Sequence, residues 1–279
     1  MPEAGWHADP WGEARLRWWD GSAWAPATTD DPDTPPPTGA AATVVAGRSA
    51  PPSLGFSAVG WAFGAVVLSI IAAIALSTAA YYLFPDTDIA WVLGAQVGQW
   101  GVLIGACRRY SRQRGTGDVA TDFGFRFERR DVWRGVGYFW IGFVAVVVVE
   151  SFLTDPRFQG TNTELPRHFR GDIIGFAVIA VLTVVGAPLV EELFFRGLLL
   201  RGLLAKFSER RAVIMQAVVF GIAHVNPVQG LANVSVVAFA TTIGCTVGFA
   251  AVRYRRLGPG IVAHGIQNLL ATTVVLLTR

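Results

Sequence analysis

The sequence contains few charged residues and few cysteines for its length. Asp, Glu, Lys and Arg make up 15% of the 279 residues, whereas 52% are hydrophobic, which is too apolar for an ordinary soluble domain. The two cysteines, Cys107 and Cys245, are too few for a disulfide framework, and both lie in or beside apolar runs. The basic residues flank these runs, so the net charge of +3 gives no indication of a nucleic-acid partner.

Two common hydrolase motifs are also missing. There is no H-E-x-x-H, so a soluble zincin-type site is not indicated. There is no G-x-S-x-G nucleophile elbow, and no serine at membrane depth stands in the context that a Ser/His dyad would need. Any hydrolytic chemistry must therefore depend on other side chains.

Long apolar runs recur along the chain. Most are close to the roughly 20 residues that cross a bilayer core of about 30 Å as a helix, and a backbone in lipid must satisfy its own hydrogen bonds. We therefore predict an all-α, polytopic transmembrane helical bundle. The fourth run is expected to continue as an amphipathic helix through Leu204, and the fifth is short enough to be buried among the others. The seven predicted spans are 57–84, 89–107, 135–153, 173–190, 212–225, 232–252 and 259–277.

The connections between these spans differ sharply in charge. Those at 108–134, 196–211 and 253–256 together carry sixteen Lys and Arg, whereas the connections on the other side carry three. Because basic connections stay in the cytoplasm, the sequence predicts a multi-pass protein of the cell membrane with a cytoplasmic N-terminus.

The residues before the first span form two further segments. Residues 1–29 are expected to form a small aromatic-stapled hairpin module with D-P and D-G turns, and 30–55 a disordered, Pro-rich linker before the transmembrane domain, 56–279. The first segment resembles a short module of unknown function that precedes membrane segments in many bacterial proteins. It is a candidate for binding a cytoplasmic partner or the membrane surface. Its five tryptophans are Trp6, Trp11, Trp18, Trp19 and Trp24.

Three polar clusters interrupt the later spans. Glu191 and Glu192 come directly after the fourth apolar run, at its predicted cytoplasmic end, and Arg196 follows them. The fifth span contains F-G-I-A-H at 220–224, and the seventh contains H-G-I-Q-N at 264–268. Ionisable groups at such positions are costly, so they indicate a functional site.

The spacing within these clusters predicts which side chains meet. Glu192 and Arg196 are separated by one helical turn, so they are expected to pair, which leaves Glu191 to act on a water molecule. His264 and Asn268 have the same spacing and are expected to project from one face of their helix.

These residue types form a set suited to hydrolysis. A carboxylate with an imidazole can deprotonate water, directly or on a metal, while an imidazole and a carboxamide can donate hydrogen bonds to an oxyanion. Gly186 and Pro188, just before the glutamates, favour a kinked or broken helix that admits water. Two alternatives remain: a proton-coupled transporter and a non-catalytic scaffold, each of which would use the same Glu and His residues.

The three clusters in this order resemble the CAAX-protease and bacteriocin-processing (CPBP, Abi-type) family of intramembrane proteases. The matching patterns are E-E-x-x-x-R at 191–196, F-x-x-x-H at 220–224 and H-x-x-x-N at 264–268, within a resemblance that covers about 57–279. The resemblance implies an endopeptidase that acts on a membrane protein or a lipidated peptide. Eukaryotic members remove the last three residues of prenylated C-a-a-X proteins, and many bacterial relatives are linked to bacteriocin immunity or maturation.

The resemblance also implies roles for individual residues. Glu191 would be the general base, with His224 helping to activate the water, and His264 and Asn268 would form the oxyanion hole. The set Glu191, His224 and His264 is compatible with Zn²⁺, which takes three protein ligands and a water, and equally with a metal-free mechanism. The supporting residues would be Glu192, Arg196 and Phe220.

Overall fold

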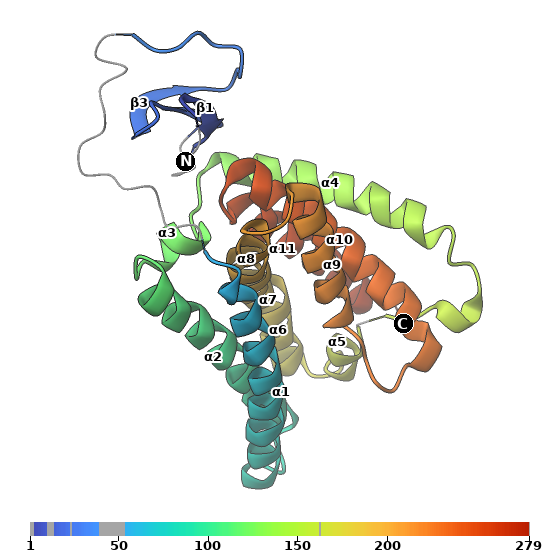
Figure 1. The fold of residues 1–279 in the computed structure, drawn as a ribbon. Helices are drawn as coiled ribbons and strands as arrows, with labels where there is room; N and C mark the ends of the chain where they lie inside the picture. The colour runs from blue at the N-terminus through green and yellow to red at the C-terminus, as the bar shows by residue number, and fades with distance from the viewer. Residues whose placement is uncertain (1–2, 10–13, 23, 39–53, 162, 279) are drawn as a thin grey trace.

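The computed structural model describes residues 3–9, 14–22, 24–38, 54–161 and 163–278, most of which are helical (Figure 1). Three strands precede the helices: β1 (Gly5–Ala8), β2 (Leu16–Trp19) and β3 (Trp24–Thr29). The helices are α1 (Ser57–Leu83), α2 (Asp88–Arg114), α3 (Val119–Phe123), α4 (Arg130–Glu150), α5 (Glu164–His168), α6 (Ile173–Val181), α7 (Ala187–Glu191), α8 (Leu200–Leu204), α9 (Glu209–Ile222), α10 (Asn233–Tyr254) and α11 (Gly258–Leu277). Two π-helical segments, η3 (Leu182–Gly186) and η4 (Glu192–Leu199), and two short 3₁₀ turns, η2 (Pro156–Phe158) and η5 (Gly230–Ala232), complete the elements.

The N-terminal strands form a three-stranded antiparallel sheet in the order β1-β2-β3, which is one strand more than the expected hairpin. Tryptophans face one another across it: the Trp6 and Trp18 rings are 5.3 Å apart and the Trp19 and Trp24 rings 5.2 Å apart. Such aromatic pairs stabilise a sheet that has little other core. Trp11 and the linker residues 39–53 lie outside the described residues.

Helices α1 and α2 form a long antiparallel hairpin whose lower part extends beyond the other helices in Figure 1. Each has 27 residues, so each is about 40 Å long at 1.5 Å per residue. Their backbones approach closely at Gly98, where a Cβ atom would lie 2.5 Å from the carbonyl oxygen of Ala72. A glycine is therefore required at this crossing.

The fourth apolar run continues as one helical segment from Ile173 to Leu204, as predicted. Gly186 and Pro188 predict a kinked or broken helix, and the helix is not broken at these residues. Gly186 and Pro188 remain helical, and the wider turns of η3 and η4 lie on either side of α7 instead. The glutamate pair consequently lies inside the helix, roughly 20 Å from its Leu204 end.

The bundle agrees with the prediction of about seven spans, except for the length of the fifth. Six helices in the described part of the chain are long and apolar enough to cross a membrane. The exception is α9, whose 14 residues reach only about 21 Å, less than the roughly 30 Å of a bilayer core. It begins at Glu209, within a basic connection, and packs against α10, which agrees with the alternative of a short helix buried among the others.

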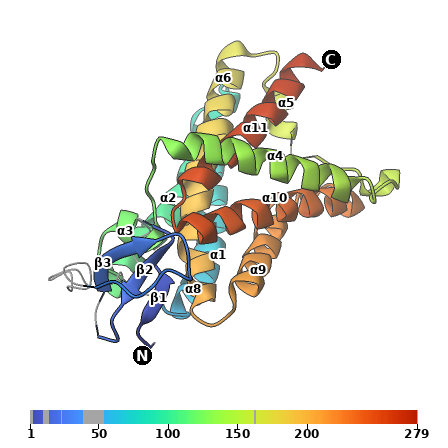
Figure 2. The same ribbon diagram turned by 90° about the horizontal axis from the view of Figure 1, so that it is seen from above.

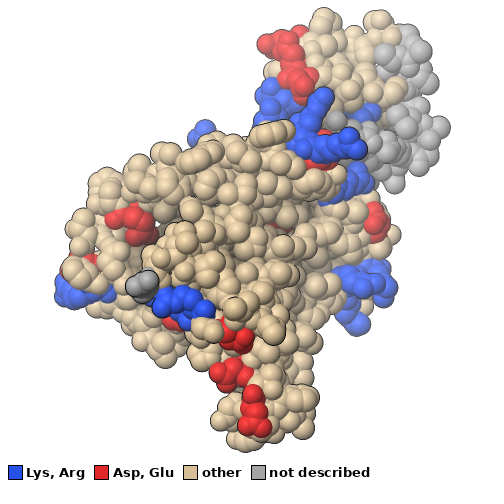
Figure 3. All heavy atoms as spheres, turned by 180° about the vertical axis from the view of Figure 1, so that it is seen from behind, with Lys and Arg blue, Asp and Glu red and all other residues tan. Residues whose placement is uncertain are grey.

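The three basic connections lie together on one side of the bundle. Arg201 donates to the carbonyl oxygens of Asp122 and Arg255, at 3.3 and 2.9 Å, and Arg256 forms an ion pair with Asp131 at 3.0 Å. On the opposite side, Gln229 donates to the carbonyl oxygen of Thr161. The grouping of the connections agrees with the charge asymmetry of the sequence. Figure 3 shows the resulting surface, with a broad uncharged area over the helices and charged groups at its margins.

Helices α4 and α10 close the bundle over α11. Seen from above, they run alongside each other across the view (Figure 2), and both contact α11. Helix α10 also contacts α9. The elements that carry the three polar clusters, α7 with η4, α9 and α11, are thereby held in one packed group.

Candidate active site

Glu191 lies between two histidines that come from different helices. Its Oε2 atom is 3.9 Å from Nε2 of His224, just after α9, and 3.8 Å from Nε2 of His264, in α11. This oxygen is buried and has no hydrogen-bond partner within the described residues. Distances of this length are too long for direct hydrogen bonds but allow one bridging water molecule. The carboxylate and both imidazoles therefore converge on one position.

The orientation of His224 is set by its own helix. Its Nδ1 lies 2.7 Å from the carbonyl oxygen of Phe220, four residues earlier. A carbonyl oxygen only accepts hydrogen bonds, so Nδ1 carries the proton, and a neutral His224 presents the Nε2 lone pair toward Glu191. The Phe220 ring packs on this imidazole at 4.4 Å and on that of His264 at 5.9 Å, so Phe220 supports both histidines.

Glu192 connects Arg196 with His264. The predicted pair of Glu192 and Arg196 is confirmed, with Oε1 and Nη1 2.9 Å apart and both side chains fully buried. The same Oε1 accepts from Nδ1 of His264 at 3.1 Å, which turns Nε2 of this imidazole toward Glu191. The two partners, a guanidinium and an imidazole N–H, offset the cost of burying the Glu192 carboxylate. A buried carboxylate without such partners would destabilise the fold.

The two adjacent glutamates therefore have different surroundings. Glu192 is fully buried, whereas the Glu191 side chain is 21% exposed and the neighbouring His224 side chain 27% exposed. Part of the Glu191 side chain is therefore open to a substrate or a water molecule, although its Oε2 is buried, whereas Glu192 is closed to both. The pairing of Glu192 is as predicted, and the action of Glu191 on a water molecule stays a prediction.

A glycine lets α11 approach this cluster. A Cβ atom at Gly260 would lie 2.9 Å from Oε2 of Glu192, so a larger residue would push against the buried carboxylate. His264 is one turn further along the same helix, at the distance from Glu192 that its Nδ1 hydrogen bond requires. The close packing at Gly260 therefore helps to position His264.

Asn268 has a partner that the sequence did not predict. Its Nδ2 donates to the carbonyl oxygen of Thr183, in η3, at 2.8 Å. A π-helical turn displaces the regular ladder, which leaves carbonyl groups available to side chains. The carboxamide has a second N–H, so Asn268 both anchors α11 to η3 and retains a donor.

The donor set at Glu191 suits a zinc ion in its chemistry. Zn²⁺ takes imidazole nitrogens and carboxylate oxygens at about 2.0–2.2 Å in a tetrahedron, which puts neighbouring ligand atoms about 3.4 Å apart. The observed separations, 3.8 and 3.9 Å, would have to shorten by about 0.5 Å. Over the described part of the chain, no three His, Cys, Asp or Glu side chains already lie in metal-ligating geometry. Both histidines direct Nδ1 to an oxygen acceptor, as metal-bound imidazoles generally do.

Several residues that support the site gave no signal in the sequence. Gln216 is buried in α9 and donates to the carbonyl oxygen of Gly244 at 2.9 Å, and Arg196 donates to the same oxygen at 3.4 Å. Backbone carbonyl groups and isolated glycines belong to no motif, so only the packed helices reveal them.

Six membrane-length helices around a buried cluster of Glu, His and Arg define a multi-pass membrane protein with a polar site among its helices. Residues 173–270 match the family model described as type II CAAX prenyl endopeptidase Rce1-like. The three motifs all lie within this segment, so the match confirms the resemblance to the CAAX-protease family. Comparisons with curated proteins and with solved structures give no match.

Proposed function

We propose that this protein is an intramembrane endopeptidase that hydrolyses a peptide bond of a membrane protein or a lipidated peptide. The observation that carries the proposal is the position of Glu191 Oε2 between Nε2 of His224 and Nε2 of His264. The match of residues 173–270 to the CAAX prenyl endopeptidase model supports the same reaction class. A transporter would need polar groups along a path across the membrane, whereas these groups converge on one atom.

In this mechanism Glu191 is the general base. Its unpartnered Oε2 holds the attacking water, which the Nε2 lone pair of His224 also contacts. The water oxygen attacks the carbonyl carbon of the substrate while its proton passes to the Glu191 carboxylate. The same proton then moves to the leaving nitrogen as the C–N bond breaks. Such proton transfer contributes about 10²–10⁴ to a rate.

His264 and Asn268 are proposed to stabilise the oxyanion. Because Nδ1 of His264 donates to Glu192, its Nε2 can also donate only when the ring is an imidazolium. The buried Glu192 side chain, which also pairs with Arg196, lies beside this ring, 3.1 Å from its Nδ1. Asn268 would contribute its second N–H. Glu192, Arg196 and Phe220 are positioning residues in this scheme.

Zinc is a cofactor for which the site has a suitable donor set. Glu191, His224 and His264 would hold it, and zinc lowers the pKa of a bound water to about 7. A chelator titration with metal analysis of the purified protein distinguishes the two versions. Zinc lost together with cleavage would indicate a metalloprotease, and cleavage retained by metal-free protein would indicate a glutamate-dependent peptidase.

The basic side of the bundle is proposed to be cytoplasmic. The three predicted connections of that side carry sixteen Lys and Arg, of which only Arg196 is drawn into the polar site, and basic connections are retained in the cytoplasm. The N-terminal tryptophan-rich segment would then also be cytoplasmic, where it can bind a partner protein or a substrate. Labelling of a single cysteine introduced at Ser208 with a membrane-impermeant reagent tests this: protection in intact cells is expected, and labelling would contradict it.

Substrate trapping with Glu191→Ala tests the proposed function. Tagged full-length protein is isolated from membranes, and the co-purifying membrane proteins and lipidated peptides are compared between variants. We expect Glu191→Ala to retain intact substrates that wild-type protein releases as shortened products. Glu150→Ala, which removes a carboxylate at the end of α4, is the matched control and should behave as wild type. Cleavage by correctly inserted Glu191→Ala protein would refute the assignment.

A further inference from the structure

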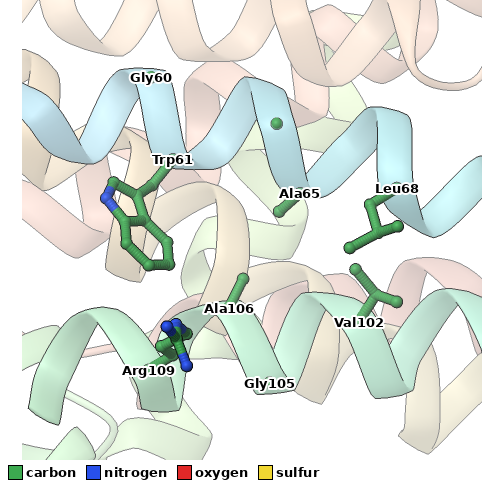
Figure 4. Close-up of a pocket in the computed structure, with 9 residues that line it drawn as sticks. Gly60, Trp61, Ala65, Leu68, Val102, Gly105, Ala106 and Arg109 are labelled. Carbon is green, nitrogen blue, oxygen red and sulfur yellow. The ribbon is translucent and has the colours of Figure 1, made fainter.

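A groove runs along the outer face of the α1–α2 hairpin (Figure 4), built from elements other than those that carry the catalytic groups. It encloses about 550 Å³, within the range of about 300–1,000 Å³ that is usual for small-molecule sites. All of its lining side chains but one are apolar. The lining residues are Gly60, Trp61, Gly64, Ala65, Leu68, Val102, Gly105, Ala106 and Arg109.

The groove exists because three of its lining residues are glycines, which have no side chain to fill the space beside the helix backbones. A Cβ atom added at Gly60, Gly64 or Gly105 would meet nothing within 4 Å. These glycines therefore do not serve close packing within the chain, unlike Gly98 at the helix crossing. From Gly60 to Leu68 the groove follows α1 for about 12 Å, close to the roughly 15 Å of hydrocarbon in one leaflet.

One end of the groove is cationic. Figure 4 shows Trp61 and Arg109 at this end and Leu68 and Val102 at the other. A second hollow of about 310 Å³ continues from it, sharing Gly105 and Arg109. The second hollow is lined by Gly105, Arg108, Arg109, Arg112 and Gln113.

The three arginines at this end have no acidic partner. All are exposed, and within the described residues none of Arg108, Arg109 and Arg112 forms an ion pair or a side-chain hydrogen bond. By contrast, Arg134 and Arg256, on the same side of the bundle, are paired with Glu128 and Asp131. A cluster of unpaired guanidinium groups at the end of an apolar groove is complementary to an anion that carries a hydrocarbon chain.

We propose that this groove binds one anionic phospholipid. An acyl chain would lie along Gly60, Gly64 and Leu68, and the phosphate would contact Arg109 with Arg108 and Arg112. Trp61 lies near the Ser57 end of α1, where a tryptophan side chain would meet lipid headgroups, and its ring makes an edge contact with Tyr110, 5.9 Å between ring centres. The proposal does not depend on the proposed protease activity.

A second copy of the chain is the main alternative occupant. Gly60 and Gly64, and Gly101 and Gly105, form two G-x-x-x-G patterns of the kind that bring membrane helices together. A twofold dimer of parallel copies through this groove would, however, place Arg109 of each copy against the same cationic end of the other. Like charges repel at such a contact, whereas a phosphate neutralises them. Charge therefore favours the lipid.

Native mass spectrometry of the full-length protein in detergent tests the charge requirement. Phosphatidylglycerol and phosphatidylcholine with identical acyl chains are added at equal concentrations. One phosphatidylglycerol should be retained in preference to phosphatidylcholine. Arg109→Gln should weaken its retention about fivefold, which is the effect of one basic residue near anionic lipid. Arg130→Gln removes another exposed arginine on the same side of the bundle and should leave retention unchanged. Equal retention of the two lipids by wild-type protein would overturn the proposal.

A second pair of variants tests the groove. Gly64→Leu fills it with a side chain for which the fold has open space, so the protein should fold and lose the retained lipid. Gly101→Leu makes the same change at an open position outside the groove and should retain lipid as wild type does. Unchanged retention by Gly64→Leu would overturn the proposal. So would a wild-type dimer that Gly64→Leu abolishes, because it would assign the groove to a second copy.

Discussion

The α1–α2 hairpin buries a smaller share of its apolar sequence than the helices from Ile173 onward, of which 22% of the Ile173–Leu204 segment and 33% of α11 are buried. In the most apolar part of α1, and likewise of α2, 17% of the residues are buried, against 56% for the segment that contains α10. The hairpin exposes its hydrophobic side chains, whereas the later helices enclose Glu192 and Arg196. Helix α1 and the run from Ile173 to Leu204 are both strongly apolar, so hydropathy does not distinguish them. The two segments differ in whether they place charged side chains inside the bundle, where each charge needs a partner of opposite sign.

The largest expected effect is on catalysis. Glu191→Gln keeps the size of the side chain but removes the base, so kcat should fall by up to about 10⁴-fold. Asp86→Asn removes an exposed carboxylate at the tip of the hairpin and should leave kcat unchanged. Both are measured with purified protein and a substrate identified by trapping. Similar kcat values for Glu191→Gln and Asp86→Asn would contradict the assignment of catalysis to the later helices and not to the hairpin.

The proposed oxyanion donors should give the next largest effect. His264→Ala and Asn268→Ala should each lower kcat by about 10²–10³. The control is His168→Ala, because this histidine is exposed and contacts Asp88 of the hairpin, 3.2 Å away, outside the polar site. Loss of kcat in His168→Ala equal to that in His264→Ala would contradict the assignment.

Loss of the buried ion pair between Glu192 and Arg196 should lower the free energy of unfolding. Arg196→Met leaves Glu192 buried beside only His264, and breaking a buried ion pair costs about 3–5 kcal/mol. Arg114→Met, at the exposed end of α2, should change stability by less than about 0.5 kcal/mol. Thermal unfolding in detergent measures both. Adding Glu192→Gln to Arg196→Met should recover part of the lost stability, and no recovery would argue against an uncompensated charge as its cause.

The smallest expected effect comes from glycines. At Gly221 a Cβ atom would lie 2.2 Å from Oγ1 of Thr241 and 2.8 Å from the carbonyl oxygen of Val237, so Gly221→Ala should cost about 1–3 kcal/mol. At Gly101 a Cβ atom meets nothing, and Gly101→Ala should stabilise α2 by about 0.5–1 kcal/mol. Equal changes in the unfolding temperature would show that the two regions pack alike.

The sequence was sufficient for the helical class and for the pairing of Glu192 with Arg196, because apolar length and i,i+4 spacing are local properties. It was also sufficient for the continuation of the fourth apolar run as a helix to Leu204, although the side chains that follow Glu191 are buried by other helices. It left open whether the short fifth run spans the membrane or is buried among the others, because composition does not reveal where a short helix begins within a charged connection.

The hydrogen-bond partners of Asn268 and His264 could not be predicted from the sequence, for a different reason. The hydrogen bond of Asn268 depends on a carbonyl group at Thr183 made available by η3, and that of His264 depends on the close approach of α11 at Gly260. Both are consequences of packing between segments about 70–85 residues apart. Motif spacing within one helix carries no information about such contacts.

The central claim is that the two histidines act with Glu191 as one site. A double-mutant cycle of His224→Ala and His264→Ala, read as kcat on the trapped substrate, tests it most directly. Residues that act as a unit are not additive, so the double variant should be within about tenfold of the slower single variant. Losses that multiply, so that the double variant is slower by the product of both single effects, would contradict a single site.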